Sequence, residues 1–315
     1  MKVFVAGAGG AIGKHLVPQL AADGHDIVGM IRSQSKRGLV SDLGAQPVVA
    51  DALDPDAVIR AVSDAKPEAI VHQLTSIPGA INSRHLDRDF ALTNRLRTEG
   101  TDNLLAAARE AGARRFVIQS FAGWPYDPRG GGVKTEEDPL DPEPVAPLRN
   151  MLEAIRHLET TVTGANWIEG LVLRYGPFYG PGTSLSANPD GTMTAMVRKR
   201  RFPVVGGGTG VWSFIQIEDA AAATVAAVRG GPAGIYNVVD DDPAPVSEWL
   251  PALAEAIGAK PPMRIPRWLG RLGAGEAGVT MMNDVCGASN AKAKRELNWQ
   301  PRYASWRQGF VEGLG

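Results

Sequence analysis

The chain has 315 residues, of which 44% are hydrophobic and 21% charged, and its formal net charge is −1 at pH 7. This length allows one large domain or two coupled domains with a sizeable core. The near-zero charge excludes the long-range field that would favour nucleic acid or an anionic membrane as a partner. A single cysteine, Cys286, excludes an intrachain disulfide, so we expect a cytoplasmic protein. The lone thiol and scattered histidines form no metal-ligand cluster, and no apolar run approaches the roughly 18 residues of a membrane span.

Short apolar runs alternate with amphipathic helical patterns through the first half of the chain. This alternation predicts an α/β fold in which crossover helices connect the strands of a parallel sheet. The first helix would follow a glycine turn and end at Gly24, and Asp54 before Pro55 is a typical helix N-cap. The expected strands are Val3–Ala6, Ile27–Ile31, Pro47–Ala50, Ala69–His72, Phe116–Ile118 and Trp167–Leu173.

The second half is punctuated by proline and glycine, which predicts a smaller and irregular substrate-binding part over residues 174–315. The nucleotide-binding domain would span residues 1–173, with strands near 212–240 returning to it. Clearer helices are expected at Glu218–Arg229 and Ser247–Ile257. Residues 126–147, rich in proline, glycine and acid, are expected to form a mobile surface loop that overhangs the site.

Three glycines with the spacing G-x-x-G-x-x-G separate the first strand from the first helix: Gly7, Gly10 and Gly13. In such a turn, backbone N–H groups and the positive end of the helix face a pyrophosphate. Glycine is needed where a Cβ would collide with the phosphate or with the strand. Strand, turn and helix follow in order, so we predict a dinucleotide site to which Ala11 and Ile12 also contribute.

The end of the second strand distinguishes between the two common dinucleotides. An NAD site usually has an acid there, which hydrogen-bonds the ribose 2′-hydroxyl. Here the strand runs into Arg32 and Ser33, with Lys36 one turn later. A guanidinium can pair with a 2′-phosphate, so this loop favours NADP(H) as the cofactor. The alternative is an ordinary solvated basic loop.

Several motifs, taken in this order, resemble the extended short-chain dehydrogenase/reductase superfamily, of the NAD(P)-dependent epimerase/dehydratase type. The resemblance runs nearly end to end and implies a doubly wound parallel-sheet Rossmann fold with a small C-terminal substrate part. It also implies that Asp51 and Ala52 contact the adenine. Beyond the fourth strand, Gln73, Leu74 and Thr75 would line the nicotinamide and substrate, and Tyr175 would belong to the cofactor site. The motifs are the glycine signature 7–13, the pair 51–52, and the segments 173–181, 214–219, 236–238 and 294–301.

The family's catalytic pair, Y-x-x-x-K, is absent from the helix expected at Leu148–Val162. With Glu159 aligned to the glutamate that follows the family's tyrosine by eight residues, Met151 and Ile155 occupy the tyrosine and lysine positions. The hydroxyls left as catalytic candidates are Ser120, after the fifth strand, and Tyr126, the nearest phenol and first choice for a replacement acid. The alternatives are that Ser120 only caps the strand end and that Tyr126 only packs the loop.

The substrate side of the predicted site is apolar. Many relatives grip a nucleotide diphosphate with an arginine at the position that Trp212 occupies here. This tryptophan predicts an apolar pocket that suits a neutral molecule, such as an aromatic one. The other residues expected to line the pocket are Phe121, Trp124, Met151 and Ile155. Each of these side chains is equally compatible with ordinary core packing.

The leading functional hypothesis is an NADPH-dependent oxidoreductase of atypical type that reduces a carbonyl or activated double bond of a hydrophobic small molecule. A redox-neutral isomerase, dehydratase or epimerase with bound NADP is the second hypothesis, and a non-catalytic NADP(H) sensor is the third. The resemblance also implies a possible homodimer, formed through the helices near Asp89–Gly112 and Leu148–Val162.

Overall fold

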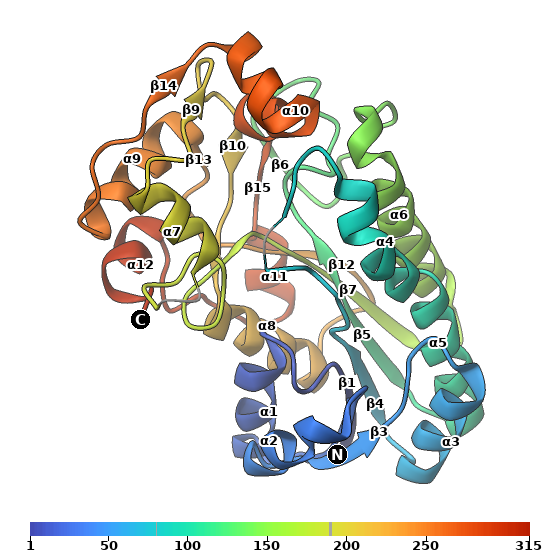
Figure 1. Cartoon of the computed structure of the whole chain (residues 1–315). Helices are drawn as coiled ribbons and strands as arrows, with labels where there is room; N and C mark the ends of the chain where they lie inside the picture. The colour runs from blue at the N-terminus through green and yellow to red at the C-terminus, as the bar shows by residue number, and fades with distance from the viewer. Residues whose placement is uncertain (80, 189–190) are drawn as a thin grey trace.

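The computed structural model describes residues 1–79, 81–188 and 191–315. A seven-stranded sheet lies at its centre, in the order β12-β7-β5-β4-β1-β2-β3, and all neighbouring strands are parallel (Figure 1). The predicted doubly wound α/β fold is therefore confirmed. The strands are β1 (Lys2–Ala6), β2 (Asp26–Ile31), β3 (Gln46–Val49), β4 (Ala69–His72), β5 (Arg115–Phe121), β7 (Glu169–Tyr175) and β12 (Gly234–Val238).

Helices cover both faces of the sheet, which explains why its strands read as continuous apolar runs. Along β1, Val3 and Val5 pack into the cluster on one face, while Phe4 and Ala6 pack into the cluster on the other. The first cluster includes residues of α1 (Gly13–Ala22) and α8 (Ile217–Arg229). The second includes residues of α3 (Pro55–Ala65), α4 (Leu86–Arg97), α5 (Glu99–Ala111) and α6 (Arg149–Gly164). This alternation is the period of two that a pleated strand imposes.

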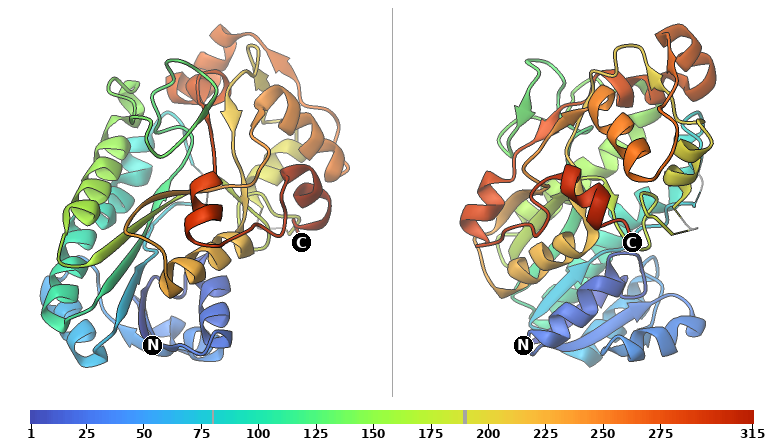
Figure 2. Two further views of the ribbon diagram at one scale, coloured as in Figure 1. Left: turned by 180° about the vertical axis from the view of Figure 1, so that it is seen from behind. Right: turned by 90° about the vertical axis from the view of Figure 1, so that its left-hand side faces the viewer.

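The C-terminal part forms its own core beside the carboxyl ends of the strands (Figure 2). Aromatic residues dominate this core, with Trp249 and Phe310 each packing against Phe214. Its helices are α7 (Thr192–Arg198), α9 (Val246–Ala256), α10 (Arg267–Asn283) and α12 (Trp306–Glu312). Its two-residue strands are β8 (Phe178–Tyr179), β9 (Val204–Val205), β10 (Val211–Trp212), β11 (Ile215–Gln216), β13 (Ala244–Pro245) and β14 (Arg264–Ile265). Between β11 and β13 the chain returns to the main sheet as β12, which pairs with β7.

The segment 126–147 is anchored, which corrects the expectation of a mobile loop. Its strand β6 (Val133–Lys134) pairs with β15 (Gly287–Ala288), and Tyr126 forms an antiparallel bridge with Leu140. The segment ends in a single helical turn, η2 (Ala146–Leu148), that leads into α6. The remaining short elements are η1 (Gln34–Lys36), α2 (Arg37–Asp42) and α11 (Ala291–Glu296).

Across the described ranges, we find no helix with both the length and the apolar character needed to cross a bilayer.

Candidate functional site

The glycine turn between β1 and α1 is shaped by close backbone approaches. Gly7 has a φ of +97°, and a Cβ there would lie 2.9 Å from the carbonyl oxygen of Gln73 at the end of β4. A Cβ on Gly13 would overlap the carbonyl oxygen of Ala8, and one on Gly10 would lie 3.1 Å from that of Gly7. A turn this tight requires glycine at these positions.

The amino end of α1 is left open by its sequence. Its N-cap residue, Ile12, makes no side-chain cap, and the first turn carries no acidic residue. The positive end of the helix is therefore not neutralised by a side chain of its own first turn. A turn that brings backbone amides and a helix end together in this way fits the pyrophosphate of a dinucleotide.

Basic side chains lie where β2 meets this turn. Lys36 donates a hydrogen bond from Nζ to the carbonyl oxygen of Gly9, 3.3 Å away, so the side chain reaches back over the turn. Ser33 caps η1 by accepting from the backbone N–H of Ser35, and Arg32 is exposed beside it. The loop therefore presents two cations and no acid at the place where an NAD site carries a carboxylate.

The loops after β3 and β4 complete the edge of the sheet. The Asp51 carboxylate accepts from the backbone N–H of Leu53, and the carbonyl oxygen of buried Ala52 accepts from Asn103 Nδ2. The predicted cap is also present, because Asp54 Oδ1 accepts from the N–H of Ala57 in α3. These carboxyl-terminal loops are adjacent because β3, β2, β1 and β4 are neighbours.

Gln73 and Leu74 are held by β5 and β7. The carbonyl oxygen of Leu74 accepts from Gln119 Nε2 at 3.0 Å, and Gln73 Nε2 donates to the Tyr175 hydroxyl at 3.1 Å. Tyr175 is buried in the core beside α8, where its hydroxyl also lies 2.6 Å from Thr224 Oγ1. The Tyr175 hydroxyl therefore holds the Gln73 side chain, and the assignment of Tyr175 to the cofactor site stays a prediction. Thr75 is exposed one residue beyond Leu74.

The two predicted catalytic hydroxyls meet in one buried polar network. Ser120 Oγ donates to Glu159 Oε1 at 2.7 Å, and Glu159 forms a two-point ion pair with Arg174 at 2.8 and 2.6 Å. Arg174 Nη1 donates to the Tyr126 hydroxyl, which in turn donates to Asn237 Oδ1 at 2.6 Å. The network joins the carboxyl ends of β5, β7 and β12 to α6.

Tyr126 is 2% exposed, and burial raises the pKa of its hydroxyl above the ordinary value even beside the Arg174 guanidinium. Its proton is directed at Asn237, and that of Ser120 at Glu159. These contacts favour the alternative that Tyr126 packs the loop, because they tie it to the sheet. Its role as the replacement acid stays a prediction.

The predicted apolar residues are brought together only in part. Phe121 and Trp124 are half-buried with ring centroids 6.1 Å apart, and Trp124 packs with Met151 in a cluster that links α4, α6 and α10. Trp212 lies in the C-terminal core 4.9 Å from Trp249, measured between ring centroids. Ile155 is fully buried, so its expected contact with substrate is corrected to a core position.

The two apolar clusters meet at α10. Trp212 donates from its indole N–H to the carbonyl oxygen of Met281 at 2.8 Å, and the Met281 side chain packs against the Trp124–Met151 cluster. Trp212 and Trp124 therefore belong to two neighbouring apolar clusters and do not form one continuous patch.

The sequence reasoning missed two residues of this region. The motif at residues 236–238 gives Asn237 no separate role, although its Oδ1 accepts a hydrogen bond from the Tyr126 hydroxyl. Arg97 was not singled out, although it lies on the buried face of α4 with Phe90 and Thr93. Its spacing from them, four and seven residues, was a usable signal because it places a charge on an apolar helix face.

A parallel Rossmann sheet with a glycine turn and an uncapped helix at its first crossover is typical of proteins that bind NAD(P). The chain belongs to the NAD dependent epimerase/dehydratase family, whose model matches residues 3–238. It is thus an NAD(P)-dependent oxidoreductase of the extended short-chain dehydrogenase/reductase superfamily.

Curated relatives include reductases. A 3-diazoavenalumate denitrifying reductase of Streptomyces is 42% identical over 320 residues, which cover 98% of this chain and 99% of that protein. A quinoline-1-oxide ketoreductase of Stigmatella aurantiaca is 27% identical over 82% of this chain and 74% of its own length.

Solved structures share the fold. The UDP-glucose 4-epimerase of Thermotoga maritima, solved with UDP-glucose, superimposes with a TM-score of 0.77 at 22% identity, covering 100% of this chain and 97% of that one. The Thermus thermophilus UDP-glucose 4-epimerase in complex with NAD gives a TM-score of 0.72 at 24% identity, covering 100% and 98%.

Proposed function

We propose that the chain is an NADPH-dependent reductase of a hydrophobic small molecule. The observation that carries this proposal is the replacement of the family's tyrosine and lysine by Met151 and Ile155, with the hydroxyls of Ser120 and Tyr126 directed into a buried network. The site therefore keeps a fold built for a nicotinamide cofactor but offers no phenol–lysine pair beside it. A reductase with such a site needs a substrate whose reduction does not depend on proton donation by a side chain.

The chain's own residues would hold and orient both reactants. The glycine turn and the open end of α1 would bind the pyrophosphate, while Arg32 and Lys36 would bind the 2′-phosphate. Phe121, Trp124 and Met151 would pack against the substrate and exclude water. When bound, NADPH supplies the hydride.

We further propose that the acceptor is a diazo group, with a carbonyl or activated double bond as the alternative. Reduction of a diazoquinone by one hydride breaks the carbon–nitrogen bond, releases dinitrogen, forms one carbon–hydrogen bond and leaves the ring oxygen as a phenolate, which takes up one proton to give the phenol. A phenolate, with a conjugate-acid pKa of about 10, is far less basic than an alkoxide, so water can supply this proton. The name of the Streptomyces relative, which is 42% identical, supports this acceptor.

The experiment gives the purified chain NADPH with a diazoquinone that carries an acidic side chain, and separately with a matched ketone and a matched enone. We expect NADPH oxidation and dinitrogen release in equal amounts with the diazo compound only, measured by absorbance and mass spectrometry. Turnover of the ketone or enone alone would overturn the diazo assignment and keep the reductase. No NADPH oxidation with any of the three would overturn both.

A further inference from the structure

Arg97 is a buried cation at the carboxyl edge of the sheet. It is the last residue of α4, its side chain is 6% exposed, and it shares the buried helix face with Phe90 and Thr93. The chain kinks at the next residue, Thr98, whose φ and ψ of −95° and −85° end the helix. Arg97 therefore lies where α4 passes the end of β4.

The guanidinium has no acceptor among the described residues. Its Nε and Nη1 atoms are buried without a hydrogen-bond partner, while Nη2 is not fully buried, and no carboxylate in the described ranges forms an ion pair with the side chain. Neighbouring His72 cannot accept from it: His72 Nε2 donates to the carbonyl oxygen of Leu96, and His72 Nδ1 accepts from the N–H of Leu74. Burial lowers the pKa of His72 to about 4, so the imidazole is neutral at physiological pH.

A buried charge with neither counter-ion nor hydrogen bond is strongly unfavourable in a folded protein. Burial lowers the pKa of Arg97 only to about 10, so the side chain stays charged at neutral pH instead of releasing its proton. An anion that binds beside it would remove this cost, and the planar guanidinium suits two-point contact with phosphate or carboxylate oxygens.

Arg97 lies near the carboxyl edge of the sheet, where we propose that the cofactor binds. His72 ends β4, and the next residue, Gln73, has its carbonyl oxygen against Gly7 of the glycine turn. Gln73 Oε1 and Asn94 Oδ1 are further buried polar atoms without a partner here. Asn94 lies one helical turn before Arg97 on α4, whereas the Gln73 amide is directed at Tyr175 in the cluster of α1 and α8, on the other face of the sheet.

We propose that Arg97 binds an anionic oxygen of a ligand at this edge, either a phosphate of the dinucleotide or a carboxylate of a second ligand. The site goes beyond the proposed function, since it concerns binding and not the acceptor that is reduced. It differs from the Arg32 loop because β4 lies on the other side of β1 from β2.

The test compares Arg97→Met, Arg97→Lys and the control Arg95→Met in the purified full-length chain. Arg95 is two residues away on the same helix but exposed, and it pairs with Glu99. Calorimetry measures the Kd of NADPH and NADH, and of 4-hydroxycinnamate and its uncharged amide with the NADP⁺-loaded protein. Thermal melting of each ligand-free variant is recorded in parallel.

We expect Arg97→Met to weaken binding of an anionic probe about tenfold or more, as for other lost charge-assisted contacts, without lowering the melting temperature of the ligand-free protein. Arg97→Lys should recover part of the affinity, and Arg95→Met should match the wild type. Equal weakening of NADPH and NADH identifies a cofactor phosphate. Weakening of the cinnamate but not of its amide, with dinucleotide affinity retained, identifies a carboxylate.

Unchanged affinity of Arg97→Met for all of these probes overturns the proposal, and a lowered melting temperature would then mark Arg97 as a packing residue. Because each measurement is of binding, absence of turnover with any acceptor would leave this result intact. Loss of NADPH affinity alone would point to the 2′-phosphate and would likewise contradict an Arg97 site at β4.

Discussion

The proposed preference for NADPH rests on Lys36 and Arg32. Lys36 is tied to the glycine turn through Gly9, so its charge is held near the point where an adenosine ribose would enter. Arg32 is exposed one residue after β2 and is free to turn toward a phosphate. Two cations at this position favour a 2′-phosphate over a 2′-hydroxyl.

Replacing Arg32 by aspartate should weaken NADPH at least about tenfold while changing NADH little, because the new carboxylate repels a phosphate and can accept from a hydroxyl. Calorimetry with both dinucleotides measures the ratio. Arg60→Asp, an exposed position on α3 with the same change in charge, is the matched control. Equal weakening of NADPH and NADH by Arg32→Asp would contradict the assignment.

Tyr126 is expected to act on stability and not on chemistry. Tyr126→Phe leaves Asn237 Oδ1 and one Arg174 donor without their buried partner, which should cost about 1–3 kcal/mol in the free energy of unfolding. Urea denaturation measures this loss, and turnover per folded molecule should stay near that of the wild type. A large drop in turnover at unchanged stability would restore Tyr126 as the proton donor.

Asp240 makes stability depend on pH. It is 1% exposed with Oδ2 unpartnered, and burial raises the pKa of its carboxyl to about 8. The folded state then holds a proton that the unfolded chain releases near pH 4, so this group's contribution to stability falls as pH rises from about 4 to about 8. Asp240→Asn should flatten this part of the profile and stabilise the protein at pH 8. An unaltered profile in chemical denaturation would contradict the assignment.

The helix α6 is joined to β7 by the Glu159–Arg174 pair. Both side chains are at most 6% exposed, and their contacts to Ser120 and Tyr126 extend the pair to β5 and to the loop after it. A buried pair of this kind holds elements in register, because breaking one half leaves the other half charged and unpaired.

We expect Glu159→Met to destabilise the fold by about 3–5 kcal/mol, since it strands the Arg174 guanidinium in the core. The double variant Glu159→Met/Arg174→Met should be markedly more stable than Glu159→Met alone, because no buried charge remains. Denaturant unfolding measures the free energy of unfolding of both variants. The control, Glu99→Met, breaks the exposed pair with Arg95 and should change this free energy little. A double variant no more stable than the single one would refute this account.

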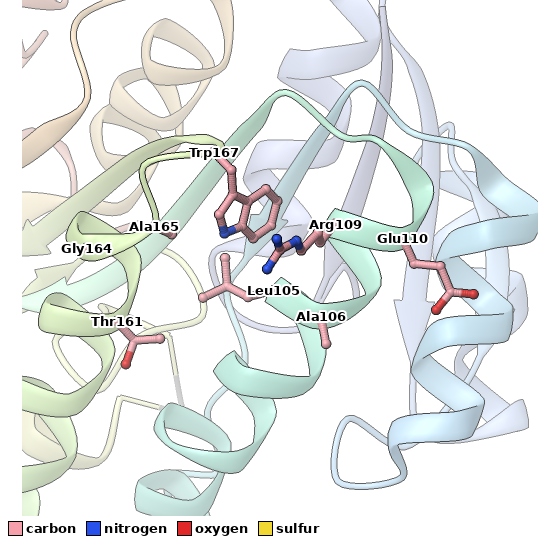
Figure 3. Close-up of a pocket in the computed structure, with 8 residues that line it drawn as sticks. All are labelled: Leu105, Ala106, Arg109, Glu110, Thr161, Gly164, Ala165 and Trp167. Atoms are coloured by element: carbon pink, nitrogen blue, oxygen red, sulfur yellow. The ribbon is translucent and has the colours of Figure 1, made fainter.

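The face formed by α5 and α6 is the expected surface for association of two chains. A cavity of about 640 Å³ opens between these helices, lined in part by Ala106, Thr161 and Trp167 (Figure 3). The Arg109 guanidinium lies over the ring of Trp167, 5.6 Å from its centroid, and Trp167 is 41% exposed. An exposed indole beside a groove is a feature that interfaces use.

We predict that light scattering of the purified chain gives twice the mass of one chain. Ala106→Glu, which places a charge in the groove of Figure 3, should shift the protein to a monomer without lowering its melting temperature. Ala22→Glu, the same substitution at an exposed position of α1 that does not line the groove, serves as the control. A monomeric wild type would refute the prediction.

Local spacing in the chain was enough to predict the parallel sheet, the glycine turn, the Asp54 cap and the basic loop after β2. Each of these depends on residues that are close together in sequence: a period of two in strands, a period near four in helices, and glycine where the backbone must turn tightly. The missing tyrosine and lysine could also be recognised, because a helix register follows from its apolar positions.

Tertiary packing alone decided which partners the hydroxyls of Ser120, Tyr126 and Tyr175 bind. Ser120 meets Glu159 across 39 residues, Tyr126 meets Asn237 across 111, and Tyr175 meets Gln73 across 102. These partners are set by the strand order, in which β12 returns beside β7, and by the face of the sheet toward which each side chain points. That Arg97 lacks a partner could likewise not be predicted from the sequence. It can be recognised only once the elements that surround the side chain have been placed.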